Sequence, residues 1–392
     1  MQSKGNMSPF KMFVTLIVGF LLGFAFAQLL FTTNCKITPV ITISTSMKTK
    51  LSNCENPPKV NYQLYGDNED MINSTNLQAW QLTENGEIIE ILNQRQQPHK
   101  INRTLANRLF SEIRVVCWIL TGPKNHAKKA IHVKRTWGSR CNKLLFMSSA
   151  EDEELGTIKL AVGEGRGNLW HKTREAMKYI YENHYNDGDW FLKADDDTYV
   201  ILENLRAFLY SFSTDAPVYF GCKFKKYVRQ GYMSGGAGYV LSKEALRRFA
   251  LEAYPNRTIC RQSNGGAEDE QMGYCLQNVG VVAGDSRDDE KRGRFFPFRL
   301  HDLIVPKNKS SWYWRYIFYA TKAGLRCCSN NAISFHYIQP DYMYVLEYLI
   351  YNLSAFGISI EHHLPLKRNT SELVEKWRHE VSDNLLQSNN LL

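Results

Sequence analysis

Strand-like and helix-like segments alternate along the chain from Ile113 onward. Apolar runs rich in β-branched and aromatic residues predict strands at 113–121, 143–147 and 189–193, and helical hydrophobic spacing predicts a helix at 169–184. The alternation continues through 198–212, 218–222, 242–254 and 268–279, with Ser242 as a helix N-cap. This order predicts an α/β domain with a mostly parallel central sheet. Such sheets bind ligands at the carboxyl ends of their strands.

The N-terminal segment has a different pattern. Met12–Phe31 contains no charged residue and would span roughly 30 Å as a helix, the thickness of a bilayer core. A cleaved signal peptide is the competing interpretation, but its small-residue cleavage signal would lie inside the apolar run. Lys4 and Lys11 precede the run, so the positive-inside rule predicts a cytosolic tail at 1–11 and a signal anchor at 12–31. The rest of the chain would then be lumenal, which excludes nucleic-acid partners.

Composition predicts the remaining boundaries. Residues 32–105 are rich in Asn, Thr, Ser, Gln and Lys, which predicts a lumenal stem with one local helix at 76–97. A compact domain is expected at 106–370, and a polar, frayed tail at 371–392. Over the whole chain of 392 residues, 44% are hydrophobic and 22% charged, which excludes wholesale disorder and a polytopic membrane protein. The net charge of +9 is spread along the chain and favours a solvated basic surface over a dedicated phosphate site.

Cysteine usage agrees with a lumenal location. None of the nine cysteines has the CxxC spacing of a zinc or redox site, so disulfides are expected. Cys327 and Cys328 are expected to bond to different partners, because a bridge between adjacent residues is strained. Acceptor triplets for N-glycosylation occur at Asn73, Asn102, Asn256, Asn308, Asn352 and Asn369.

Three carboxylates, Asp195, Asp196 and Asp197, follow an apolar strand directly. Crowded like charges need a cation or hydrogen-bond donors, and an all-oxygen cluster suits Mn²⁺ or Mg²⁺ bridging a diphosphate. The alternative is an acidic turn that caps the next helix.

Further candidate residues each have a functional and a purely structural interpretation. The loop 163–168 carries Arg166 and leads into a helix that contains Lys172. This arrangement favours an anionic ligand, and the alternative is an ordinary surface turn. Glycines at 231–238 allow backbone to approach a ligand, or form a tight bend. The acidic run 268–270 offers a general base, or stabilises a helix N-terminus. Trp312 is a sugar-stacking platform or core, and His336 alone would be interpreted as a core residue.

Five sequence segments, taken together, resemble those of one protein family. They are the segments 141–149, 190–200, 232–242, 267–273 and 334–337. They resemble the β1,3-galactosyltransferases that make core 1 O-glycan, the glycoprotein-N-acetylgalactosamine 3-β-galactosyltransferases, within the wider β1,3-glycosyltransferase group that includes Fringe. The resemblance covers about 110–355. It implies a type II Golgi membrane protein with a GT-A (Rossmann-like) fold, Mn²⁺ as cofactor, UDP-galactose as donor and GalNAc-Ser/Thr glycoproteins as acceptors. A homodimer is also compatible with it.

The resemblance assigns roles to residues that match the family's motifs. It implies metal binding by Asp195, Asp197 and His336, which replaces the core interpretation of His336, and a base at Asp269 in the pair with Glu268. Implied donor-binding residues are Thr121, Gly122, Arg166, Gly167, Asn168, Lys172, Asp196 and Tyr337; implied acceptor-binding residues are Trp312, Gly235 and Gly236. Glu270 departs from the family, where an apolar residue is frequent, and Arg166 and Gly167 fit the wider group only loosely.

Three other functions are considered. A catalytically inactive chaperone of the same fold would be expected to lack the acidic motif, which is intact here. A Fringe-like β1,3-transferase with another donor or acceptor would differ by few contacts in the pocket. A metal-dependent phosphodiesterase would need more His and Asp ligands than the sequence offers.

Overall fold

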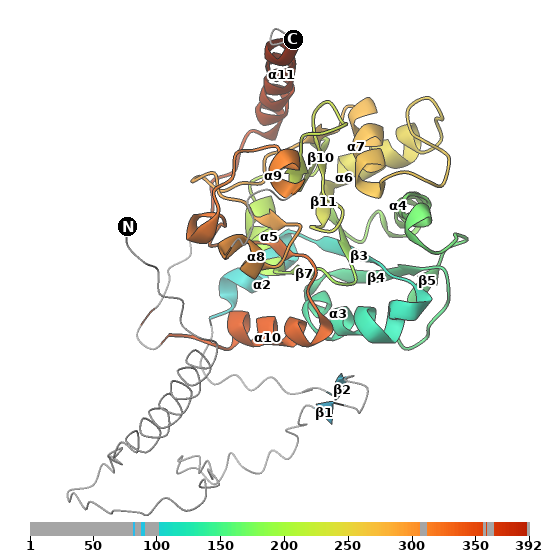
Figure 1. Cartoon of the computed structure of the whole chain (residues 1–392), viewed down its shortest axis with the longest axis vertical. Helices are drawn as coiled ribbons and strands as arrows, with labels where there is room; N and C mark the ends of the chain where they lie inside the picture. The colour runs from blue at the N-terminus through green and yellow to red at the C-terminus, as the bar shows by residue number, and fades with distance from the viewer. Residues whose placement is uncertain are drawn as a thin grey trace, which may run out of the picture. The chain divides into compact units, whose positions relative to one another are not determined.

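A seven-stranded sheet forms the centre of the computed structural model, which describes residues 81–82, 88–90, 102–305, 312–355, 358 and 364–389 (Figure 1). In spatial order the strands are β12 (Val282–Ala283), β8 (Val218–Gly221), β11 (Tyr239–Ser242), β6 (Trp190–Asp195), β3 (Val115–Leu120), β4 (Lys143–Ser148) and β5 (Thr157–Lys159). Every pairing is parallel except the two made by β11. The predicted mostly parallel α/β sheet is therefore confirmed.

The sheet is buried on both faces, as the continuous apolar sequence of its strands requires. In β3, Val115, Cys117 and Ile119 point into one hydrophobic cluster, and Val116, Trp118 and Leu120 point into the other. One cluster is completed by residues of α4 (Leu169–His184), α6 (Lys243–Arg248) and α7 (Glu268–Asn278). The other is completed by α2 (Thr104–Glu112), α3 (Ile131–Arg135), α5 (Leu202–Leu209), α10 (Pro340–Tyr351) and α11 (Thr370–Asn389). Helices thus cover both faces of the sheet.

A smaller three-stranded sheet lies beside the acidic turn. Its order is β13 (Phe295–Phe296), β14 (Ser334–Phe335) and β7 (Tyr199–Val200). β9 (Lys223–Phe224) and β10 (Tyr232–Met233) form an antiparallel pair, and α8 (Leu300–Ile304) and α9 (Trp312–Tyr316) are short helices. The predicted N-cap is confirmed, because the Ala245 N–H donates to Ser242 Oγ at 3.1 Å.

Two sequence-based expectations outside the sheet are wrong. Within the predicted helix at 76–97, the described residues form the antiparallel strands β1 (Gln81–Leu82) and β2 (Ile88–Glu90). The tail after Ser371 is not frayed over its described length, because α11 packs Val374 and Trp377 into the core. Its apolar residues are too few to give a clear helical pattern, yet burying a Trp and a Val stabilises the helix by a few kcal/mol.

Among the described residues, the cysteines pair as Cys117–Cys141, Cys260–Cys275 and Cys327–Cys328, while Cys222 is buried and free. The expectation that Cys327 and Cys328 bond to different partners is wrong. The other four disulfide cysteines pair among themselves, and the backbone of Gly293 bonds this segment on both sides, accepting from the Ser329 N–H and donating to Cys327 O. Tertiary hydrogen bonds of this kind can hold a geometry that the isolated dipeptide would avoid.

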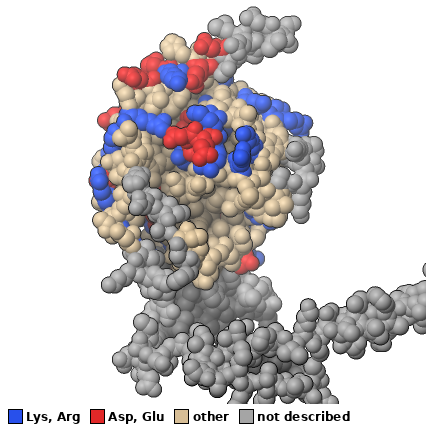
Figure 2. All heavy atoms as spheres, turned by 90° about the vertical axis from the view of Figure 1, so that its left-hand side faces the viewer, with Lys and Arg blue, Asp and Glu red and all other residues tan. Residues whose placement is uncertain are grey.

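In the described part of the chain, no helix has the length and apolarity needed to cross a membrane. The predicted cytosolic tail, the anchor at 12–31 and most of the stem lie outside the described residues. Figure 2 shows one face of the domain, on which small groups of basic and acidic side chains lie among a larger uncharged area. On this face the charge is mixed.

Candidate active site

The carboxyl end of β6 carries a group of side chains able to hold a metal ion. Single ligand atoms of Asp195, Asp197 and His336 all lie within 4.8 Å of one another. His336 Nε2 is 3.1 Å from Asp197 Oδ1 and 3.9 Å from Asp195 Oδ2. The small sheet brings them together, because β14, which ends just before His336, pairs with β7, which starts just after Asp197. The Ile338 N–H fixes this loop by donating to Asp197 O at 2.9 Å.

Gly236 makes room for the histidine. A Cβ at Gly236 would lie 2.8 Å from His336 Nε2 and closer still to two other ring atoms, a separation that real Cβ atoms do not adopt. The Gly236 carbonyl accepts from Thr198 Oγ1 at 2.9 Å, which holds the glycine against the acidic turn. Gly236 therefore lies next to the metal-binding group, although the resemblance implies a role in acceptor binding.

The three aspartates have different surroundings. Burial alone would raise the pKa of Asp197, but its contacts with His336 and Lys129 outweigh this and lower the pKa to about 2. Lys129 Nζ donates to Asp197 Oδ2 at 2.9 Å. Burial raises the pKa of Asp196 to about 6, against the effect of its hydrogen bond from Thr121.

The side chain of Asp196 is held by residues that follow β3, and its Oδ1 lies 3.9 Å from the Lys129 Nζ that also binds Asp197. Its Oδ2 accepts from Thr121 Oγ1 at 2.8 Å and Asn125 Nδ2 at 2.9 Å, and the residue is only 6% exposed. Because β3 and β6 are parallel, with Leu120 opposite Asp195, these contacts join the carboxyl ends of two neighbouring strands. The structure thus joins Asp196 to Thr121 beside the metal-binding group.

The N-terminus of α7 presents two acidic side chains of different character. Glu268 is buried, and its Oε1 accepts from Tyr239 OH at 2.7 Å and from Thr173 Oγ1 at 3.0 Å. Asp269 is half-buried, with Oδ2 accepting from the Gly235 N–H at 3.1 Å and Oδ1 from the Glu270 N–H at 2.9 Å. Burial raises the pKa of both carboxyls.

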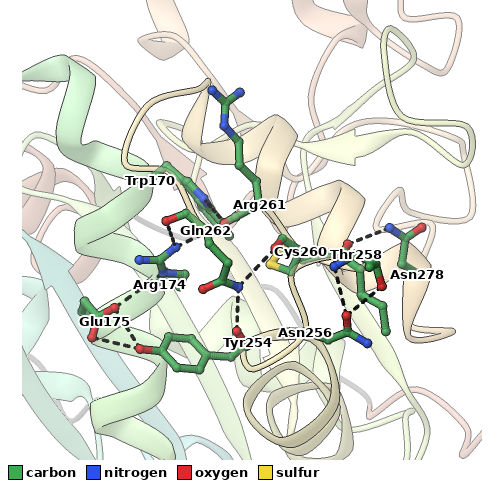
Figure 3. The surroundings of a disulfide bond; sticks show 12 residues. Trp170, Arg174, Glu175, Tyr254, Asn256, Thr258, Cys260, Arg261, Gln262 and Asn278 are labelled. Carbon is green, nitrogen blue, oxygen red and sulfur yellow. Dashed lines mark hydrogen bonds and ion pairs between the residues drawn. A yellow bond between two sulfur atoms is a disulfide. The ribbon is translucent and has the colours of Figure 1, made fainter.

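The position of α7 is set by its disulfide and by α4 (Figure 3). Cys260–Cys275 links α7 to the loop before it. From α4, Trp170 Nε1 donates to Arg261 O at 2.9 Å and Arg174 Nη1 donates to Gln262 O at 2.5 Å. The base candidate at the start of α7 is therefore held by covalent and polar contacts behind it.

The predicted donor loop is built around a buried lysine. Lys172 Nζ donates to Thr121 O at 2.9 Å and to Glu164 Oε1 at 2.6 Å. The same Glu164 carboxylate lies beside Gly122, where an added Cβ would be 2.5 Å from Oε2. Asn168 Nδ2 donates to Glu164 O, while Arg166 and Gly167 are exposed. Thr121, Gly122, Lys172 and Asn168 thus gather around Glu164, which the sequence analysis did not single out.

Two aromatic side chains predicted at the site are partly solvent-exposed. Trp312 on α9 is 42% exposed, so it is not a core residue, and its ring contacts those of Phe224 and Phe298. Tyr337 is 47% exposed, with a positive φ of 58° and its ring centroid 3.9 Å from that of His336. Both side chains are therefore partly accessible from solvent.

Besides Glu164, sequence reasoning missed three polar residues of the site. Lys193, on β6, reaches both Asp195 and the glycine loop, Lys129 binds Asp197, and Tyr239 binds Glu268. A lysine inside the apolar strand Trp190–Asp195 was the available signal for Lys193. A cavity of about 610 Å³ is lined by residues of α2, α5 and the end of α10, and by none of the predicted site residues.

The fold and this site define the class of protein. Residues 113–287 match the family described as Fringe-like, so the domain is a Fringe-like glycosyltransferase domain of GT-A type. More particularly, the chain belongs to the glycoprotein-N-acetylgalactosamine 3-beta-galactosyltransferases. It is 49% identical over 276 residues to glycoprotein-N-acetylgalactosamine 3-beta-galactosyltransferase 1 of Xenopus laevis, an alignment that covers 69% of this chain and 76% of the relative.

More distant relatives share part of the chain. A beta-1,3-glucosyltransferase of Mus musculus is 27% identical over 167 residues, covering 42% of this chain and 33% of the relative. Chondroitin sulfate synthase 3 of Homo sapiens is 25% identical over 181 residues, covering 41% and 20%. The chain therefore spans a third or less of these two proteins.

Proposed function

We propose that this enzyme transfers galactose from UDP-galactose to the 3-hydroxyl of GalNAc α-linked to Ser or Thr, with inversion at the anomeric carbon. The observation that carries the proposal is the 49% identity to a 3-beta-galactosyltransferase named for that acceptor sugar. The site supports it, because Asp195, Asp197 and His336 converge at the sheet edge that also receives Asp269.

The ligand set suits Mn²⁺. Two carboxylates and one imidazole, with His336 Nε2 directed at both aspartates, are hard and borderline donors of the kind this ion accepts. Asp195, Asp197 and His336 would hold it, and when bound the ion would neutralise charge developing on the departing diphosphate. Half-buried Lys129 beside Asp197 adds a second positive group at the same place.

Asp269 is the proposed base. Its half-buried carboxylate is oriented by two backbone N–H groups, and its raised pKa favours taking a proton from the acceptor hydroxyl. Glu268 is less suited, because it is buried and one of its oxygens already accepts two hydrogen bonds. The proposed role of Glu268 is to fix the start of α7.

The remaining predicted site residues are proposed to bind substrate. The proposed nucleotide-sugar-binding residues are Lys172, Arg166, Thr121, Gly122, Gly167 and Asn168. The exposed ring of Trp312 would stack on the acceptor sugar, since flat aromatic faces bind the apolar face of a sugar ring. We also propose that 12–31 anchors the chain in the Golgi membrane with the catalytic domain in the lumen.

The test uses the purified full chain in detergent with UDP-galactose, Mn²⁺ and a GalNAc-Thr peptide, with and without chelator. UDP release together with a Galβ1,3GalNAc product that disappears in chelator is the expected result. UDP binding without transfer to this peptide would refute the acceptor, and absence of UDP binding by the folded chain would refute the enzyme activity.

A further inference from the structure

Lys193 is a buried lysine at the centre of the site. It lies on β6 among Phe191, Leu192 and Ala194, which are all fully buried, and is itself 2% exposed. Its ammonium group donates to Asp195 Oδ1 at 2.5 Å and to Gly235 O at 3.0 Å, and lies 3.9 Å from Glu268 Oε2. Three chain segments therefore meet at one nitrogen atom.

A charge in this position is costly unless it is paired. Removing an ammonium group from water costs several kcal/mol, which close partners must offset. The Asp195 carboxylate at 2.5 Å and the Glu268 carboxylate at 3.9 Å place two opposite charges beside the Lys193 ammonium group. Lys193 is thus a cation whose partners all belong to the site, in a strand position where an apolar residue would be simpler to bury.

The contacts of Lys193 extend to both functional groups of the site. On one side it binds Asp195, a proposed metal ligand. On the other it binds the carbonyl of Gly235, whose own N–H donates to the proposed base Asp269 at 3.1 Å. The next residue, Gly236, packs directly against the ring of His336.

We infer that Lys193 is a positioning residue that holds the metal-binding group and the base in a fixed relation to each other, through Asp195 on one side and the Gly235 backbone on the other. The inference deepens the proposed function and rests on it for the role of Asp269. It gives Lys193 no contact with substrate. Lys193 orients Asp195 so that its Oδ2 faces His336, and it holds the Gly235 backbone where its N–H reaches Asp269 at the start of α7.

The experiment compares Lys193→Met with Lys223→Met in the full chain. Met keeps the unbranched stem and removes the ammonium group. Lys223 is a matched control, because it is also buried, at 5% exposed, and its Nζ donates to Ala283 O at 2.8 Å without contacting any described residue of the site. Three quantities are measured: the melting temperature with and without Mn²⁺, the Mn²⁺ concentration that gives half-maximal UDP binding, and kcat at saturating Mn²⁺, donor and acceptor.

Both variants are expected to melt at lower temperature than the parent. Lys193→Met alone should raise the half-saturating Mn²⁺ concentration about tenfold, as loss of a partner behind a metal ligand does. At saturating Mn²⁺ its kcat should still be about 100-fold below that of Lys223→Met, since small misplacements of reacting groups cost rates of this order. If the two variants had equal half-saturating Mn²⁺ concentrations and equal kcat, the inference would be overturned. If Lys193→Met differed from Lys223→Met in only one of these two quantities, Lys193 would not hold the metal-binding group and the base together.

Two provisions keep the test decisive. If Lys193→Met does not fold, Lys193→Arg keeps a buried cation while changing its reach; unchanged metal saturation and full kcat in that variant would refute positioning. Metal-dependent UDP binding and melting use no acceptor, so they report on Lys193 and Asp195 even if the wild-type chain transfers no galactose. Absence of galactose transfer by the wild-type chain would count against the proposed function, and not against the role of Lys193.

Discussion

Gly236→Ala tests the geometry of the metal-binding group with a single methyl. The added Cβ would lie 2.8 Å from His336 Nε2, inside the distance that real Cβ atoms keep, and nearer still to two other ring atoms. The ring cannot stay in place, and moving it breaks the 3.1 Å contact between His336 Nε2 and Asp197 Oδ1. Backbone on the glycine side gives way less readily, because Thr198 and Gly235 anchor it.

The expected loss is that of a displaced metal ligand. Changes that disturb a ligand's orientation reduce metal affinity about 10–100-fold, which corresponds to about 1.4–2.7 kcal/mol at 25 °C. The half-saturating Mn²⁺ concentration for UDP binding, measured by titration calorimetry, should rise by that factor. UDP binding at very high Mn²⁺ should recover.

Gly265→Ala is the matched control, because the one described atom within 4 Å of an added Cβ there is the Gly167 carbonyl oxygen, at an ordinary van der Waals distance of 3.9 Å. It should titrate like the parent. If Gly236→Ala also titrated like the parent while remaining folded, His336 would not be a metal ligand, and the reasoning from the ring contact would fail.

Three further predictions concern other parts of the site. Asp269→Asn should lower kcat about 10³-fold, within the usual range for a lost general base, and leave metal-dependent UDP binding unchanged; an equal loss of UDP affinity would contradict the base assignment. Trp312→Ala should raise the acceptor KM roughly tenfold without changing the donor KM, whereas Tyr342→Ala, at a similarly exposed ring on α10, should change neither. In chelator, Asp196 has a pKa raised to about 6 from its ordinary 3.8, so the stability its protonated form contributes is lost as pH rises across that window. Asp196→Asn can accept the same hydrogen bonds, so it should reduce the change in unfolding free energy between pH 4 and 7 by on the order of 2 kcal/mol, measured by urea titration. Asp289→Asn, at a fully exposed carboxylate, should leave this pH dependence as in the parent. An unchanged pH dependence in Asp196→Asn would show that Asp196 ionises freely.

The local parts of the site were readable from the sequence. The apolar strand ending in Asp195 and the acidic start of α7 are short-range patterns, and both lie where the alternation of strands and helices puts them. His336 could be linked to Asp197 only through the family resemblance, because the β14–β7 pairing joins segments far apart in the chain. No local pattern records such a pairing.

The missed contacts share the same origin. Lys193 is one residue in an apolar run until the fold brings Gly235 and Glu268 to it. Glu164 looked like part of a flexible loop, yet its carboxylate pairs with buried Lys172. Local strain favoured different partners for Cys327 and Cys328, while the hydrogen bonds to Gly293 that hold this segment are tertiary.

The pairing of β14 with β7 has a consequence for biosynthesis. Asp195 and Asp197 are synthesised first, and His336, which follows β14 directly, is synthesised more than one hundred residues later. Contacts between such distant segments form after local ones, because closing a long loop costs entropy that only the finished sheet offsets. Nascent chains that end before His336 should therefore gain no protection from proteolysis when Mn²⁺ is added, while chains that extend past α10 should, and protection of the shorter chains would show that the aspartates alone suffice.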